Sequence, residues 1–121
     1  MTKEQLKNRT KEFSLNVFKF LMSLEKSKAV DVISYQLFKS SSSVAANYRA
    51  VCRGKSSSDF LNKLKVVDEE AYESLFWLEF IKGLEIECDK NELDKLIKES
   101  DELVANFSSA IKTIKEKNNL K

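Results

Sequence analysis

The sequence predicts an all-α protein folded as an up-down-up-down antiparallel four-helix bundle, and three observations support this fold class. The chain has 121 residues, of which 42% are apolar and 33% charged, a composition that suits one hydrophobic core. It contains no proline and only two glycines, so few positions can stop a helix. Apolar residues recur three, four or seven positions apart, which is the spacing of one face of an α-helix. We therefore expect a single four-helix domain over residues 1–121.

The first two helices are expected over about residues 2–25 and 29–53, with a short polar turn between them. The second helix is followed by Gly54, which we expect to take the left-handed conformation that ends many helices. The apolar stripes of these helices consist of Leu6, Phe13, Val17, Phe20 and Leu24 in the first, and Val30, Ile33, Leu37, Val44, Tyr48 and Val51 in the second.

The third and fourth helices are expected over about residues 57–87 and 90–117. Ser56 can cap the third helix, with Asp59 three positions later in an arrangement like a capping box. The fourth helix begins near one of two good N-cap residues, Asp89 and Asn91. Across the four stripes we expect a core that includes Phe13, Phe20, Ile33, Leu37, Phe60, Leu64, Leu75, Leu78, Phe107 and Ile111.

Two helices carry more apolar residues than a bundle stripe requires. Phe18 lies on roughly the opposite side of the first helix from Phe13 and Phe20, because successive residues are rotated by about 100°. The third helix is apolar in nearly every direction between Leu75 and Ile86. Such a surface is expected to contact another chain, and we predict contacts between identical subunits through Phe18, Phe76, Trp77 and Phe80. The alternative is that neighbouring loops cover these side chains.

The second helix also carries a polar seam of small or amide-bearing residues beside its apolar face. The seam consists of Gln36, Ser40, Ser43, Asn47, Ala50 and Gly54. Small residues allow a neighbouring helix to approach closely, and amide side chains can donate and accept hydrogen bonds across that contact. We interpret the seam as structural, and a strip that faces a ligand is the alternative.

The chain lacks the residues of common catalytic and metal sites. It has no histidine, and its two cysteines, Cys52 and Cys88, are isolated. Arg49 and Arg53 can pair with the acidic cluster that contains Glu69, Glu70 and Glu73, so a salt-bridge network explains these charges better than a carboxylate catalyst or di-metal site. We expect a protein that is not an enzyme, with no catalytic residue, no metal, no cofactor and no small-molecule substrate.

The sequence indicates a cytoplasmic protein without a membrane span, because no apolar run approaches the ~20 residues that a spanning helix needs. The net charge is only +2, with 21 basic and 19 acidic residues interspersed, so charge alone does not identify a nucleic-acid-binding protein.

The middle third of the chain resembles the bacterial four-helix bundle family that is also called the 23S rRNA-intervening sequence protein family. The matching positions are Gln36 to Ser40, Ser43 to Ala50, then Ser56, Asp59, Phe60 and Lys63, and finally Glu70, Glu73, Trp77 and Leu78. Lys39 stands where the family usually has arginine. The resemblance implies a four-helix bundle, often assembled as a ring of five, without an established enzymatic activity. It also points to distant relatives that bind nucleic acid and assist a reverse transcriptase.

Two hypotheses for function follow. The first is a homo-oligomer that binds RNA, DNA or a nucleic-acid-associated protein through a basic rim around Arg49, Arg53 and Lys55. The second is a protein-interaction module that binds no nucleic acid. Further candidates for the basic face are Lys3, Lys7, Arg9, Lys11, Lys112, Lys115 and Lys117.

Overall fold

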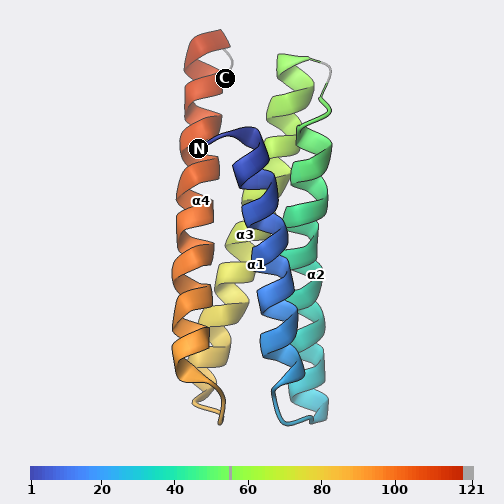
Figure 1. Cartoon of the computed structure of the whole chain (residues 1–121), viewed down its shortest axis with the longest axis vertical. Helices are drawn as coiled ribbons and strands as arrows, with labels where there is room; N and C mark the ends of the chain where they lie inside the picture. Colours follow the sequence, from blue (N-terminus) through green and yellow to red (C-terminus); the bar gives the residue numbers. More distant parts are fainter. Residues whose placement is uncertain (55, 119–121) are drawn as a thin grey trace.

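The computed structural model describes residues 1–54 and 56–118, and within them it contains four long α-helices and no strand (Figure 1). The helices are α1 (Lys3–Met22), α2 (Lys28–Val51), α3 (Ser57–Leu84) and α4 (Lys90–Asn118). Each helix packs antiparallel to the next, and α1 also contacts α4, although less extensively than the sequential pairs contact each other. The all-α class and the four-helix bundle expected from the sequence are confirmed.

The two ends of the bundle differ in what they contain (Figure 1). One end, called the terminal end, holds the start of α1, the end of α2, the start of α3 and the end of α4, which are residues 1–8, 46–54, 56–65 and 109–117. The other end, called the loop end, holds the α1–α2 and α3–α4 connections, within residues 17–31 and 78–95.

Every helix begins at a polar side chain that caps it. The four N-caps are Thr2, Ser27, Ser56 and Asp89, and each side-chain oxygen accepts a hydrogen bond from the backbone N–H three residues later, at 3.0–3.1 Å. Thr2 and Gln5 form a reciprocal capping box, because the Gln5 side chain also accepts from the Thr2 backbone N–H at 2.9 Å. These caps satisfy donors that the first helical turn leaves unpaired, so they define where each helix starts.

The helix ends correct one expectation from the sequence. Gly54 does not take a left-handed conformation, and Cys52 ends α2 with right-handed backbone angles. A Cβ at Gly54 would lie 3.2 Å from the Val51 carbonyl oxygen, which is tight, and 3.5 Å from the Phe60 Cα, which is an ordinary van der Waals contact. The left-handed residue is Glu85, with φ 55°, and it stops α3 at Leu84, three residues before the expected end.

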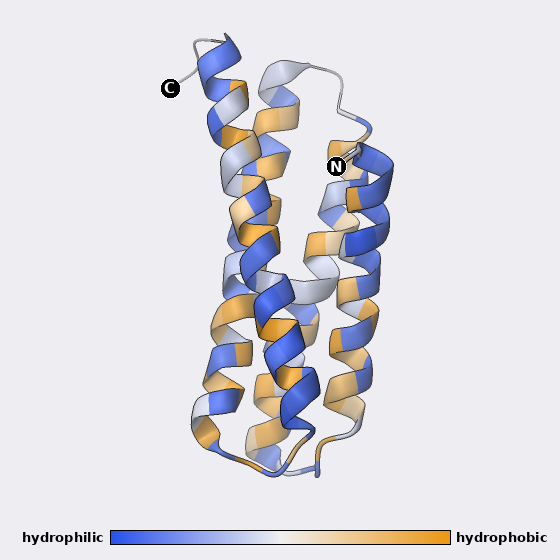
Figure 2. Ribbon diagram, turned by 60° about the vertical axis from the view of Figure 1, so that its left-hand side comes forward, coloured by the Kyte–Doolittle hydropathy of each residue, from blue (hydrophilic) through white to orange (hydrophobic). Residues whose placement is uncertain are grey.

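Apolar side chains from all four helices form one core, and the inner faces of the ribbons in Figure 2 carry most of the hydrophobic colour. Of the core residues expected from the sequence, Ile33, Phe60 and Ile111 are half-buried and pack against the core. The others are buried: Phe13, Phe20, Leu37, Leu64, Leu75, Leu78 and Phe107. Among the described residues, no helix is both long and apolar enough to cross a membrane.

We predict that Leu64→Ala lowers the free energy of unfolding by about 2–5 kcal/mol, because Leu64 is only 2% exposed and the substitution leaves a cavity in the core. Urea denaturation followed by circular dichroism at a fixed protein concentration measures the change. Val66→Ala is the control, since Val66 is exposed on the same helix and its loss should cost within about 0.5 kcal/mol. Equal losses for the two variants would contradict the assignment of Leu64 to the core.

Candidate functional site

The seam of α2 faces α3 at Ser40. The Ser40 and Ser74 hydroxyl oxygens lie 2.9 Å apart, and both residues are fully buried. Each hydroxyl is also within hydrogen-bond distance of a carbonyl of its own helix, Leu37 for Ser40 and Glu70 for Ser74. The two helices therefore meet through small side chains whose polar atoms are satisfied, as buried polar groups require.

The two amide side chains of the seam, unlike Ser40, form no hydrogen bond with a described residue of α3. The Asn47 amide donates to the Ser43 carbonyl oxygen at 2.9 Å and to the Ser43 hydroxyl at 2.7 Å, so it bonds within α2 and not across to α3. Gln36 is half-buried and makes no side-chain hydrogen bond with a residue that the structure describes. The seam thus provides a close helix contact at Ser40 and leaves one amide free.

The pairing of Arg49 and Arg53 with Glu70 and Glu73, which the sequence made plausible, does not occur. Neither arginine forms an ion pair with any carboxylate in residues 1–54 or 56–118, and both arginines are exposed. The register explains this result. Ser40 lies opposite Ser74, so Arg49, nine residues further along α2, lies near the level of Lys65, and the glutamates are about one to two turns away.

The acidic cluster of α3 is instead next to Lys39. Burial raises the pKa of Glu70 above its ordinary value, and the neighbouring Glu73 carboxylate raises it further. Lys39 opposes this shift, and Glu69 adds to it more weakly. This arrangement places a half-buried carboxylate among like charges without a paired cation at hydrogen-bond distance within the described chain.

The terminal end of the bundle is strongly basic. Its described cations are Lys3, Lys7, Arg49, Arg53, Lys63, Lys65, Lys112, Lys115 and Lys117, whereas its acidic residues are Glu4, Asp59 and Glu116. Asp59 pairs with Lys63 at 3.2 Å. The loop end has the opposite balance, with Glu25, Asp31, Glu79, Glu85, Glu87, Asp89, Glu92 and Asp94 against Lys19, Lys26, Lys28, Lys82, Lys90 and Lys95. The near-neutral net charge therefore conceals a separation of charge along the bundle.

Not every cation proposed from the sequence belongs to this basic end. Arg9 is half-buried and bonds to Glu99, with its Nε 2.7 Å from Oε2, and its Nη2 lies 3.3 Å from Glu102. This clamp joins α1 to α4 and occupies the guanidinium. Lys11, two residues further along α1, is exposed. Lys55 lies outside the described residues.

Exposed aromatic side chains form two separate patches. The α1–α2 patch contains Phe18 and Phe38, whose ring centroids are 5.2 Å apart, and Phe18 is 43% exposed. The α3 patch contains Phe76 and Phe80, which are 52% and 42% exposed and both contact the Trp77 ring. Trp77 packs against the core, and its indole N–H is buried without a partner among the described residues. Both patches therefore present aromatic rings that the isolated chain does not cover.

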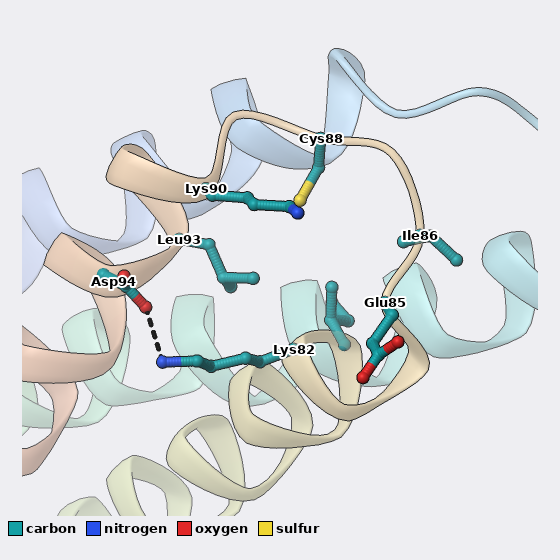
Figure 3. A pocket seen from close by; sticks show the side chains of 8 residues that line it. Lys82, Glu85, Ile86, Cys88, Lys90, Leu93 and Asp94 are labelled. Carbon is teal, nitrogen blue, oxygen red and sulfur yellow. Dashed lines mark hydrogen bonds and ion pairs between the residues drawn. The ribbon is translucent and has the colours of Figure 1, made fainter.

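A hollow of about 380 Å³ lies beside the α3–α4 connection (Figure 3). Lys82 and Asp94 form an ion pair across it at 2.9 Å, and Cys88 and Lys90 lie together on its other side. Charges of both signs line this hollow, so it favours neither an anion nor a cation. In the described part of the chain, no three Cys, Asp or Glu side chains gather in a way that could hold a metal ion, and both cysteines are free.

The fold and these surfaces define a small helical-bundle protein whose distinctive features lie on its surface. The family model of the 23S rRNA-intervening sequence protein matches residues 2–109, so the chain belongs to that family. A crystal structure of a protein of unknown function from the S23 ribosomal protein family of Bacteroides thetaiotaomicron is similar to this chain, with 28% sequence identity and a TM-score of 0.81. The similarity covers 93% of this chain and 99% of the other. No curated protein matches the sequence.

The family match confirms the resemblance found in the sequence and extends it beyond the middle third, to α1 and most of α4. Some features escaped the sequence reasoning. The Thr2–Gln5 capping box could have been found from its spacing, since a threonine followed three residues later by glutamine is its signature. The contact of Ser40 with Ser74 could not, because it depends on how α3 is rotated against α2.

We predict that Glu70→Gln raises the urea midpoint at pH 7. A carboxyl whose pKa is raised by folding disfavours the folded state once it ionises, so stability falls as pH rises from the ordinary pKa through the folded value. The gain from glutamine should therefore be present at neutral pH and absent at about pH 3, where both forms are uncharged. Glu79→Gln, at an exposed position of α3, should change the midpoint less. A gain that persists at pH 3 would contradict this electrostatic explanation.

Proposed function

We propose that this protein is a non-enzymatic bundle that assembles with copies of itself into a ring and binds nucleic acid through its terminal end. The observation that carries the proposal is the excess of unpaired cations at that end, centred on Arg49 and Arg53. A phosphate backbone is the polyanion that such a surface suits, because binding releases counterions from the nucleic acid. The family name links its members to ribosomal RNA genes, which supports RNA as the first nucleic acid to test.

The two aromatic patches support assembly into a ring. A ring requires a heterologous contact, in which one surface of a subunit meets a different surface of the next. The α1–α2 patch and the α3 patch are different surfaces, and Phe18, Phe76 and Phe80 all lie toward the loop-end half of their helices. The family resemblance favours five subunits. In such a ring the terminal ends of all subunits lie on one side, so a modest basic patch is repeated around a rim.

The exposed aromatic rings also favour a second candidate, a module that binds another protein through helix packing and binds no nucleic acid. The two candidates differ in their response to salt. Phosphate contacts weaken steeply as salt concentration rises, whereas apolar contacts do not.

For assembly, we predict that the parent protein is larger than a monomer and that Phe76→Ser with Phe80→Ser reduces its mass, because these rings are expected to be buried between subunits. Multi-angle light scattering after size-exclusion chromatography measures the mass across a dilution series. Val66→Ser is the matched control, since Val66 is an exposed apolar residue on α3 outside the patch. A parent that is monomeric at every concentration would refute assembly.

For nucleic-acid binding, we predict that the parent binds generic RNA and duplex DNA weakly, with affinity that falls steeply with salt. Arg49→Ala with Arg53→Ala should weaken binding and flatten the plot of log affinity against log salt by roughly one unit per lost phosphate contact. Fluorescence anisotropy across a salt series measures both quantities.

The control for this experiment removes two charges from the opposite end of the bundle. Lys26→Ala with Lys28→Ala changes the net charge by the same amount at exposed loop-end positions and should leave the slope nearly unchanged. All variants must retain the helical signal and the mass of the parent. If the parent fails to bind at low salt, nucleic-acid binding is excluded and the protein-interaction module becomes the preferred function.

A further inference from the structure

A second hollow, of about 560 Å³, opens at the terminal end where α1, α3 and α4 meet. Phe60 and Ile114 provide its apolar surface, and Lys3 and Lys117 stand beside them. Ser56 and Ser57 add hydroxyl groups at the start of α3. The described side chains that line this hollow carry no carboxylate, in contrast to the hollow of Figure 3, which Glu85 and Asp94 line. The Asp59 carboxylate lies next to Gly54, and it is paired with Lys63. The hollow is therefore suited to an anionic ligand with an apolar part.

Phe60 lines this hollow, and the Lys3 side chain, which also lines it, lies over the Phe60 ring. Phe60 is half-buried, and the Lys3 ammonium nitrogen lies 4.9 Å from the centre of its ring. The cation over the ring is a flexible lysine side chain near the start of the chain. A planar group can take its place on the ring at small cost, since exposed cation–π contacts are weak. Lys3 then remains close enough to contact a phosphate attached to that group.

Gly54, in the α2–α3 connection, lies beside Phe60 and also lines this hollow. A Cβ at Gly54 would lie 3.5 Å from the Phe60 Cα and 3.2 Å from the Val51 carbonyl oxygen. The first of these distances is an ordinary van der Waals contact, so the connection packs directly against the start of α3.

An aromatic ring flanked by lysines from two different helices is the arrangement that binds single-stranded nucleic acid, because bases stack on the ring and phosphates contact the cations. A duplex hides the faces of its bases, so it cannot use such a ring. We propose that the terminal end binds single-stranded nucleic acid and that a base of the strand stacks on Phe60, while Lys3 and Lys117 contact the adjacent phosphates. This inference rests on the proposed function, in which the terminal end binds nucleic acid.

The first test uses the unaltered protein and oligonucleotides of equal length and charge. The strands are oligouridine RNA, oligothymidine DNA, the same DNA with abasic sites in place of the bases, and a duplex of the same length. Both single strands should bind roughly 5- to 100-fold more tightly than the abasic strand, since one stacked base accounts for a factor of that size.

The outcomes separate this inference from the proposed function. Equal, salt-dependent affinity for the abasic strand, or a duplex that binds as tightly as the single strands, would overturn the Phe60 site and leave the basic rim intact. Failure of every strand to bind at low salt would remove both proposals.

The second test changes the ring itself. Phe60→Leu should abolish the difference between base-containing and abasic strands and leave the salt slope unchanged, because leucine keeps the apolar contact but offers no ring. Phe60→Tyr should retain the difference. Tyr72→Leu, at an exposed aromatic position of α3 outside the terminal end and outside both aromatic patches, is the matched control and should have no effect. If Phe60→Leu does not fold, the tyrosine variant and the abasic strand still test the site, and a preserved difference in folded Phe60→Leu contradicts it.

Discussion

The close contact of α2 with α3 at Ser40 and Ser74 is the constraint on which the rest of the surface depends. Two fully buried serines allow the helices to approach, and their hydroxyl contact at 2.9 Å can form only in the observed register and rotation of α3. With Ser74 turned inward, Phe76 and Phe80 are rotated by about 200° and 240° from it and face outward. The same register places Arg49 away from Glu70, so a cation that could have closed a salt bridge remains exposed.

This arrangement separates two kinds of surface along one bundle. Exposed aromatic rings lie toward the loop end, and unpaired cations lie at the terminal end. In the assembly that we propose, a contact between subunits through these rings would leave the cations accessible and bring equivalent basic surfaces onto one side. The nearly neutral net charge of the whole chain gives no sign of this division, because an acidic loop end balances a basic terminal end. Where charge lies in the fold matters more here than its sum.

The sequence was sufficient for the fold and most of the core, since helical periodicity determines both in a chain without proline. It failed where a conclusion needed the position of one helix relative to another. Gly54 was expected to be left-handed, but Glu85 holds that conformation, and Gly54 lies beside Phe60 of α3. The hollow at Phe60 could not be found from sequence, because Lys3 and Lys117 lie at opposite ends of the chain. Arg9, a free cation by sequence, is occupied by Glu99.

The central claim is that the terminal end is the nucleic-acid-binding surface, and hydrogen–deuterium exchange with and without a single-stranded oligonucleotide tests it most directly. Backbone amides are followed by mass spectrometry at low salt, on the intact assembly and at saturating oligonucleotide. The account predicts slower exchange at the start of α1, the end of α2 and the start of α3, with little change around the α3–α4 connection. Protection confined to the α3–α4 connection or to the aromatic patches would contradict it.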